Sequence, residues 1–246
     1  MPKLHKHFEN TLAYRRWVIE QDNKTYGAVN TGLELLQRPN ENHVDAARAL
    51  LNKFGESIEV QQQVWTHNVA GFFPDVPAYL AGDPEHMFTR EYIHSDQTPL
   101  RVWVGVSVMG WITDQQIIER GVCIAAFALA MIPKRPVIIS PFVDLGSRTI
   151  EGAIISWDIT TEPLVIAELM TSLANPAVTR SLGLHACRLL NPRVTGSIDP
   201  DVHHEERCRA RLNAQPQDLW LMPDKYPDDS IAWIKEHVAK YAESEW

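Results

Sequence analysis

The fold is decided by residues 100–142, which read LRVWVGVSVMGWITDQQIIERGVCIAAFALAMIPKRPVIISPF. The valine-rich segment Leu100–Val106 predicts a β-strand, and the continuously apolar segment Pro136–Phe142 predicts a strand at the centre of a sheet. Between them, Thr113 can cap a helix that runs to about Met131 and is closed by a proline. The order strand, helix, strand predicts a right-handed crossover in an α/β fold.

The rest of the chain continues this α/β pattern. A short glycine-containing loop precedes the apolar segment Ala153–Asp158, so it is expected to pair antiparallel with Pro136–Phe142 as an edge hairpin. Further strands are predicted at His185–Leu190 and Leu219–Met222. Helices are predicted from a Thr161 cap to Leu173, from Pro176 to a stop at Gly183, and over Ser230–Tyr241. We therefore predict a mostly parallel central sheet with one antiparallel edge hairpin and helices on both faces.

Residues 1–59 are predicted to form a helical N-terminal extension to an α/β domain at 60–246. Its helices are expected at Leu12–Gln21 and at Asn42–Phe54, where Gly55 follows, and Ser57–Trp65 is a candidate edge strand. The segment Gly71–Pro84 is rich in proline, glycine and aromatic residues, which forbids a long regular element. We expect it to pack down as an ordered loop, a lid or a brace.

The composition favours a soluble protein of the cytoplasm. Of 246 residues, 45% are hydrophobic and only three are cysteines, without a C-x-x-C pair, so a disulfide framework is not expected. The longest apolar stretch, Val122–Pro133, is shorter than the ~20 residues that span a bilayer. A net charge of -8 argues against broad, charge-driven nucleic-acid binding. Six arginines between Arg180 and Arg211, against four acidic residues, leave room for a local basic strip.

Two resemblances follow from these segments. The order of elements resembles the von Willebrand factor A-like fold, whose metal motif follows the first strand. Here the turn after that strand, Gly105–Trp111, offers only Ser107 as an oxygen ligand for a cation. After a later strand, Asn191–Pro192 stands where the metal motif has an Asp. The resemblance therefore implies this fold over 60–246 without its metal. The segments Asp75–Met87, Pro99–Gly105 and Arg120–Gly121 are similar to an uncharacterised bacteriophage protein family, over about Val60 to Asn191.

Several residues of chemically versatile types occur without a recognisable catalytic or metal-binding spacing. His203–Cys208 matches no zinc motif and is expected to start a solvated helix. Ser107 lacks the glycine of a nucleophile elbow, and Gly27 and Gly32 form no phosphate loop. Asp75, Asp83 and Glu85 stand among prolines and glycines, where acidic side chains commonly accept hydrogen bonds in turns, and His86 and His94 lack partners evident in the sequence. We predict no catalytic residue, no metal and no cofactor.

Aromatic and arginine residues suggest a binding surface instead. Trp111 follows the first strand, at the sheet edge where α/β proteins bind ligands, and Arg148 and Arg193 lie in loops that can approach it. An aromatic ring with arginines can stack a base and hold a phosphate, although an ordinary surface is the alternative. The run Arg207, Arg209 and Arg211 is either a phosphate-contacting arm or a solvated tail.

These observations favour a non-enzymatic, phage-type accessory protein that recognises a macromolecule. The specific hypothesis is single-stranded DNA binding linked to a phage RNA polymerase, by analogy with small phage proteins. The alternative is a protein-interaction or structural module that binds another protein or itself, for which exposed apolar residues around Phe72, Phe73 and Tyr79 would speak. An enzyme would require a pocket that gathers His86, His94 and Asp75.

Overall fold

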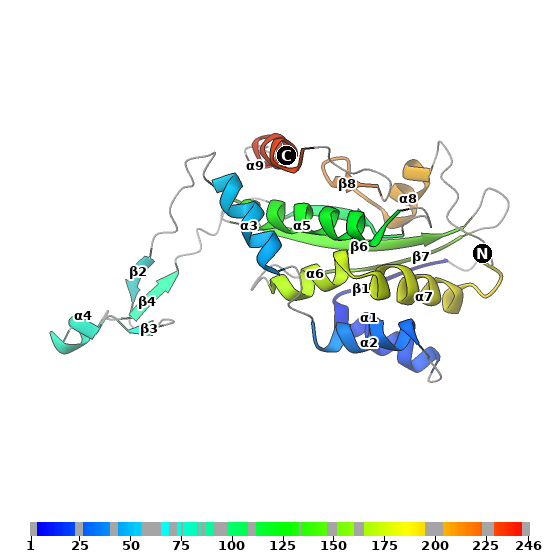
Figure 1. Cartoon of the computed structure of the whole chain (residues 1–246), viewed down its shortest axis with the longest axis horizontal. Helices are drawn as coiled ribbons and strands as arrows, with labels where there is room; N and C mark the ends of the chain where they lie inside the picture. Colours follow the sequence, from blue (N-terminus) through cyan, green and yellow to red (C-terminus); the bar gives the residue numbers. More distant parts are fainter. Residues whose placement is uncertain are drawn as a thin grey trace.

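A computed structural model of the chain describes residues 4–22, 27–39, 44–55, 65–68, 73–74, 76–82, 84, 87–90, 98–107, 112–132, 134–146, 152–159, 165–194, 204–222 and 229–242. The main body is a five-stranded sheet with helices packed against it (Figure 1). The strand order is β1-β7-β6-β5-β8, with bounds His5–Phe8, Ala153–Trp157, Val137–Leu145, Leu100–Gly105 and Leu219–Leu221.

Strand β6 is the centre of this sheet, as its apolar sequence predicts. It pairs in parallel with β5 and antiparallel with β7, while β8 and β1 add in parallel to the outer sides of β5 and β7. The α/β class, the mostly parallel sheet and the antiparallel pair are therefore confirmed. The antiparallel pair lies inside the sheet and not at its edge, because β1 covers the outer side of β7.

Alternation along the strands gives the sheet two faces. One face, called here the core face, carries Val102, Val104, Ile139 and Ile155, which all lie in the main buried cluster. The other, called here the α8 face, carries Trp103, Phe142 and Ile154 in a smaller cluster. Helix α8 (His204–Leu212) supplies Cys208 and Leu212 to that cluster, so helices cover both faces, as predicted.

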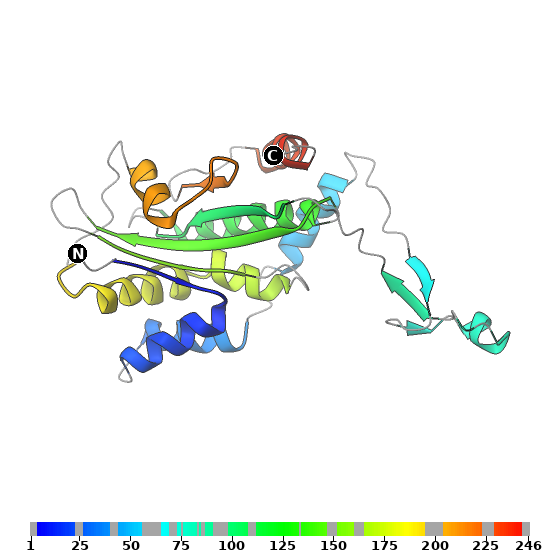
Figure 2. The same cartoon turned by 180° about the vertical axis from the view of Figure 1, so that it is seen from behind.

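The core face is covered by a layer of helices that contact β6 and β7 or one another (Figure 2). They are α5 (Asp114–Met131), α6 (Ile166–Ala174), the π-helix η1 (Ala177–Leu182) and α7 (Gly183–Leu190). A second layer packs on these helices and consists of α1 (Thr11–Gln21), α2 (Ala28–Gln37), α3 (Val44–Gly55) and α9 (Ser230–Ala242). No helix among the described residues has the length and apolar character needed to cross a membrane.

Helix α5 begins where the sequence predicts. The Thr113 side chain accepts a hydrogen bond from the Gln116 backbone N–H, and the Gln116 side chain accepts one from the Thr113 backbone, which completes a capping box. Helices α1, α3, α6 and α9 and strand β8 are confirmed as well. The predicted Thr161 cap of α6 and the predicted closing Pro133 of α5 lie outside the described residues.

Two predictions about residues 176–190 are wrong. His185–Leu190 belongs to helix α7 and is not a strand, and Gly183 does not end a helix but sits inside one, with φ -61° and ψ -46°. The reason for glycine is the packing of α7 on the sheet. A Cβ atom at Gly183 would lie 2.6 Å from Val143 Cγ2 of β6, so only glycine lets the helix approach this closely.

Strand β1 and helix α2 are absent from the sequence-based prediction. β1 has four residues and alternates His5, Lys6, His7 and Phe8, a pattern with a single apolar residue. Its pairing with β7 is what places it in the sheet, and Phe8 then packs with Tyr14 and Trp17 of α1. Tertiary contacts therefore decide this strand, not its own propensity.

A second, three-stranded sheet lies apart from the main body (Figures 1 and 2). Its order is β2-β4-β3, with bounds Trp65–Asn68, Met87–Arg90 and Phe73–Pro74, and α4 (Val76–Leu80) follows β3. The expectation that this region packs down is wrong for Tyr79 and Leu80, which are 61% and 78% exposed. Of the expected strand Ser57–Trp65, only Trp65 is described, and it begins β2.

Candidate functional site at the carboxyl end of the sheet

The predicted binding residues fall into two groups. Trp111 and Arg148 lie outside the described residues. Arg193 lies in the turn that follows α7, and Arg207, Arg209 and Arg211 lie on α8. The carboxyl-terminal end of α7 and helix α8 both lie at the end of the sheet to which β6 points (Figures 1 and 2). They lie on opposite faces of the sheet. The structure thus brings the described members of the set to one end of the molecule.

The three arginines of α8 are held by partners within the protein. Arg207 lies 3.6 Å from the carboxylate of Asp144, and Arg209 donates to Glu205 at 3.0 Å while its guanidinium lies 5.0 Å from the Trp220 ring. Arg211 donates to the backbone oxygen of Gly152 at 2.9 Å. These contacts fix α8 on the sheet, so its arginines are not a free arm.

Arg188 and Arg193 are in a different position. Both are exposed, and neither forms an ion pair with an acidic side chain in the part of the chain that the structure describes. Arg188 lies in the last turn of α7, where a cation interacts favourably with the helix dipole. Sequence reasoning selected Arg193 but missed Arg188, because nothing in the sequence shows that α7 is a helix with this end.

The turn after α7 is held rigidly by its own hydrogen bonds. The Asn191 backbone N–H donates to the Cys187 oxygen at 2.9 Å and ends the helix. The Asn191 side-chain oxygen then accepts the Arg193 backbone N–H at 3.2 Å, and the Val194 N–H donates to the Asn191 oxygen at 3.1 Å. Asn191 and Val194 are buried, so Pro192 and Arg193 are held outward.

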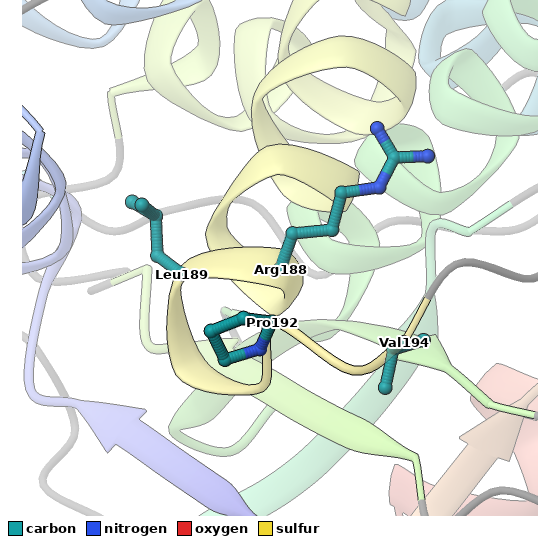
Figure 3. A pocket seen from close by; sticks show the side chains of 4 residues that line it. All are labelled: Arg188, Leu189, Pro192 and Val194. Atoms are coloured by element: carbon teal, nitrogen blue, oxygen red, sulfur yellow. The ribbon is translucent and has the colours of Figure 1, made fainter.

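Beside this turn lies an open hollow of about 460 Å³ with mainly apolar walls. Its walls are Leu189, Pro192 and Val194, and Arg188 stands at its side. Figure 3 shows that Arg188 and Leu189 leave α7 in different directions, with Pro192 between them and Val194 across the turn. The arrangement combines apolar surface with an exposed cation that has no acidic partner among the described residues, which suits a planar apolar group attached to an anion.

Asp144 is the most deeply buried carboxylate at this end of the sheet. It is 2% exposed, and besides Arg207 it lies 3.3 Å from the thiol of Cys208, whose pKa burial and this negative charge raise. Its backbone N–H donates to Ser107 Oγ at 3.3 Å, and Ser107 is buried as well. No group of three or more His, Cys, Asp or Glu side chains with metal-binding geometry occurs among the described residues.

A polar network on the α8 face was missed by sequence reasoning because four strands contribute to it. His5 Nε2 and His7 Nδ1 of β1 lie 3.3 and 3.0 Å from Ser156 Oγ of β7. His7 Nε2 lies 3.4 Å from Asp158, which also accepts hydrogen bonds from Arg101 of β5 and Ser140 of β6 at 2.7 and 2.6 Å. The alternation His5, Lys6, His7 was the only sequence signal for it.

This network lowers the pKa of Asp158 below its ordinary value. Burial acts to raise that pKa, but the hydrogen bonds from His7 and Ser140 and the positive charge of Arg101 outweigh it. Ser156, His7 and Asp158 follow one another as in a serine–histidine–aspartate triad. Ser156 is 0% exposed beneath the two imidazoles, however, so a substrate carbonyl cannot reach its hydroxyl. The network acts as a clamp that joins β1 to the sheet.

The chain matches the model of a protein family. A family model described as a domain of unknown function (DUF7192) matches residues 37–201. The chain belongs to the DUF7192 family. No curated protein and no solved structure matches it.

The DUF7192 segment includes Arg188, Arg193 and the described residues that line the hollow. It ends before α8, β8 and α9, and it begins after β1 and α1. Several other residues singled out in the sequence of this segment lie outside the described part of the chain: Asp75, Asp83, Glu85, His86 and His94. Of the histidine-rich run at 203–208, Cys208 lies on the buried side of α8 and His203 is not described.

Proposed function

We propose that this protein is a non-enzymatic accessory protein that binds single-stranded DNA at the carboxyl end of its sheet. The observation that carries the proposal is the pair Arg188 and Arg193, both exposed and without an acidic partner among the described residues. Arginine contacts phosphate oxygens through several donors at once and keeps its charge at all physiological pH values. Two such residues on a rigid helix end supply a backbone contact for a nucleic-acid strand.

The position of α8 favours a single strand over a duplex. The side chains of Arg207 and Arg209 are 27% and 31% exposed despite their partners, and α8 lies on the opposite face of the sheet from α7. A flexible strand can bend around the end of the sheet and pass both groups, while its ionic phosphate contacts are made by Arg188 and Arg193, because the guanidinium groups of Arg207 and Arg209 already face Asp144 and Glu205. A duplex, with a persistence length of roughly 50 nm, cannot follow so sharp a path without a large cost in free energy.

The net charge of -8 limits the strength of this binding. For two phosphate contacts to a single strand, log K falls with log salt at a slope of about -1.4, which is about 7-fold between 50 and 200 mM. The resemblance to phage proteins extends the proposal to transcription, in which the bound strand would belong to DNA used by a phage RNA polymerase.

The test is a fluorescence anisotropy titration of a labelled oligonucleotide with the full chain at 50 and 200 mM salt. We expect saturable binding that weakens about 7-fold at the higher salt. The variant R188Q/R193Q should lose this binding, whereas R16Q/R48Q, which removes the same charge from exposed positions of α1 and α3, should keep it. Absence of binding at both salts by the unmodified protein would end the DNA proposal.

A second candidate function, protein interaction, rests on a different part of the chain. Val76, Tyr79 and Leu80 are 56%, 61% and 78% exposed and belong to α4, the helix beside the separate small sheet. Exposed apolar groups of this size mark surfaces that a partner covers. Light scattering discriminates the two functions, because a self-associating module gives a mass that rises with concentration and a DNA-binding monomer gives the mass of one chain.

A further inference from the structure

We infer that the hollow at the end of α7 is a subsite for one unstacked nucleobase. This inference rests on the proposed DNA binding and specifies what occupies its centre. The hollow is lined by Leu189, Pro192 and Val194, and its volume of about 460 Å³ is broadly open to solvent. A heterocyclic base is flat and apolar on both faces, so it can lie against such walls and still leave its edge in water.

The charges beside the hollow match what is attached to a base. Arg188 lines the hollow itself, and Arg193 projects from the turn that carries Pro192 and Val194. A base in the hollow therefore brings its flanking phosphates within the range of two cations. The planar guanidinium of Arg188 can also stack on a base face, as arginines do in proteins that bind single strands.

The rigidity of the site supports this occupant. Asn191 holds the turn through its side-chain hydrogen bond to the Arg193 backbone, and Val194 is 2% exposed, so two walls are fixed before any ligand arrives. A preformed wall needs no ordering when the ligand binds, which preserves the small contact energy of a single base. A base inside a duplex keeps its faces in the stack, so the hollow selects a strand whose bases are free.

Abasic DNA separates the base subsite from the phosphate contacts. The full chain is titrated with three probes of equal length: an oligo-dT strand, the same strand with abasic sugars, and a duplex. We expect the dT strand to bind at least about 5-fold more tightly than the abasic strand, the low end for one stacked base. The duplex should bind no more tightly than the abasic strand.

Two leucines of one helix provide the matched variants. Leu189 and Leu184 are both half-buried residues of α7, but only Leu189 lines the hollow. L189A should remove most of the preference for dT, whereas L184A should retain it, with circular dichroism confirming that both variants fold. Equal binding of dT and abasic strands by the unmodified protein overturns the base subsite and leaves the phosphate contacts in place. Absence of binding to all three probes overturns the proposed function itself.

Discussion

The close contact between Gly183 and Val143 gives a prediction whose sign opposes helix propensity. Alanine favours a helix interior over glycine by about 1 kcal/mol, so propensity alone predicts that G183A stabilises the protein. The structure places the new Cβ 2.6 Å from Val143 Cγ2, in a fully buried part of β6. Overpacking of a tight core costs about 1–3 kcal/mol. The net expectation is a loss of about 1 kcal/mol, with an upper limit near 2 kcal/mol.

The cause can be isolated by a double-mutant cycle with V143A, which removes the methyl group that Gly183 faces. In that background the added Cβ has room, so G183A should stabilise the protein by about 1 kcal/mol and the coupling should be about 2 kcal/mol. Urea unfolding followed by circular dichroism measures all four free energies. If G183A stabilises the protein with Val143 intact, or if the coupling is zero, the packing explanation for this glycine is refuted.

Three further predictions concern the helix cap, the polar network and the cysteines. T113A should lower the free energy of unfolding by about 1 kcal/mol through loss of the capping box, measured by urea unfolding, and T98A offers a control at an exposed threonine outside any helix. The pKa of Asp158 is lowered in the folded protein. Its carboxylate therefore stabilises the fold fully above the unfolded pKa of about 3.9, and this stabilisation is lost as the pH falls through the folded pKa. The variant D158N should lack this part of the acid-induced loss of stability when the free energy of unfolding is measured from pH 6 to 2. Burial raises the pKa of Cys123 to about 11 and also raises the pKa values of Cys187 and Cys208. Native protein at pH 8 should therefore resist alkylation, whereas denatured protein should take up three labels, counted by mass spectrometry. Rapid labelling of the native protein would contradict the burial of these residues.

The elements that the sequence predicts well are those with strong local signals. β6 is continuously apolar and α5 has a capping box before a long apolar helix, and both follow the prediction closely. The prediction of a strand at His185–Leu190 is wrong because six residues are too few to show whether the apolar residues recur with the period of a helix or of a strand. The prediction that Gly183 ends a helix is wrong for a related reason. The role of this glycine depends on Val143, which lies 40 positions earlier in the chain and is brought near only by the fold.

The candidate site was predictable only in part. Arg193 could be selected from its loop, but Arg188 gains its meaning from the end of α7 and from the hollow beside it. The alternating run on α8 looked like an arm in sequence, whereas Asp144 and Glu205 hold two of its arginines in the structure. The clamp on the α8 face joins His7 of β1, Ser140 of β6 and Asp158, which follows β7, and no local sequence pattern indicates such a set.

Phosphate contacts by Arg188 and Arg193 are tested most directly by the dependence of oligo-dT affinity on salt concentration, measured for the unmodified chain and for R188Q/R193Q. Two phosphate contacts predict a slope of about -1.4 for the unmodified chain, and their loss predicts a slope close to zero, with much weaker binding, for the variant. An unchanged slope and affinity in the variant would contradict this prediction, because the two arginines would then contribute no phosphate contact.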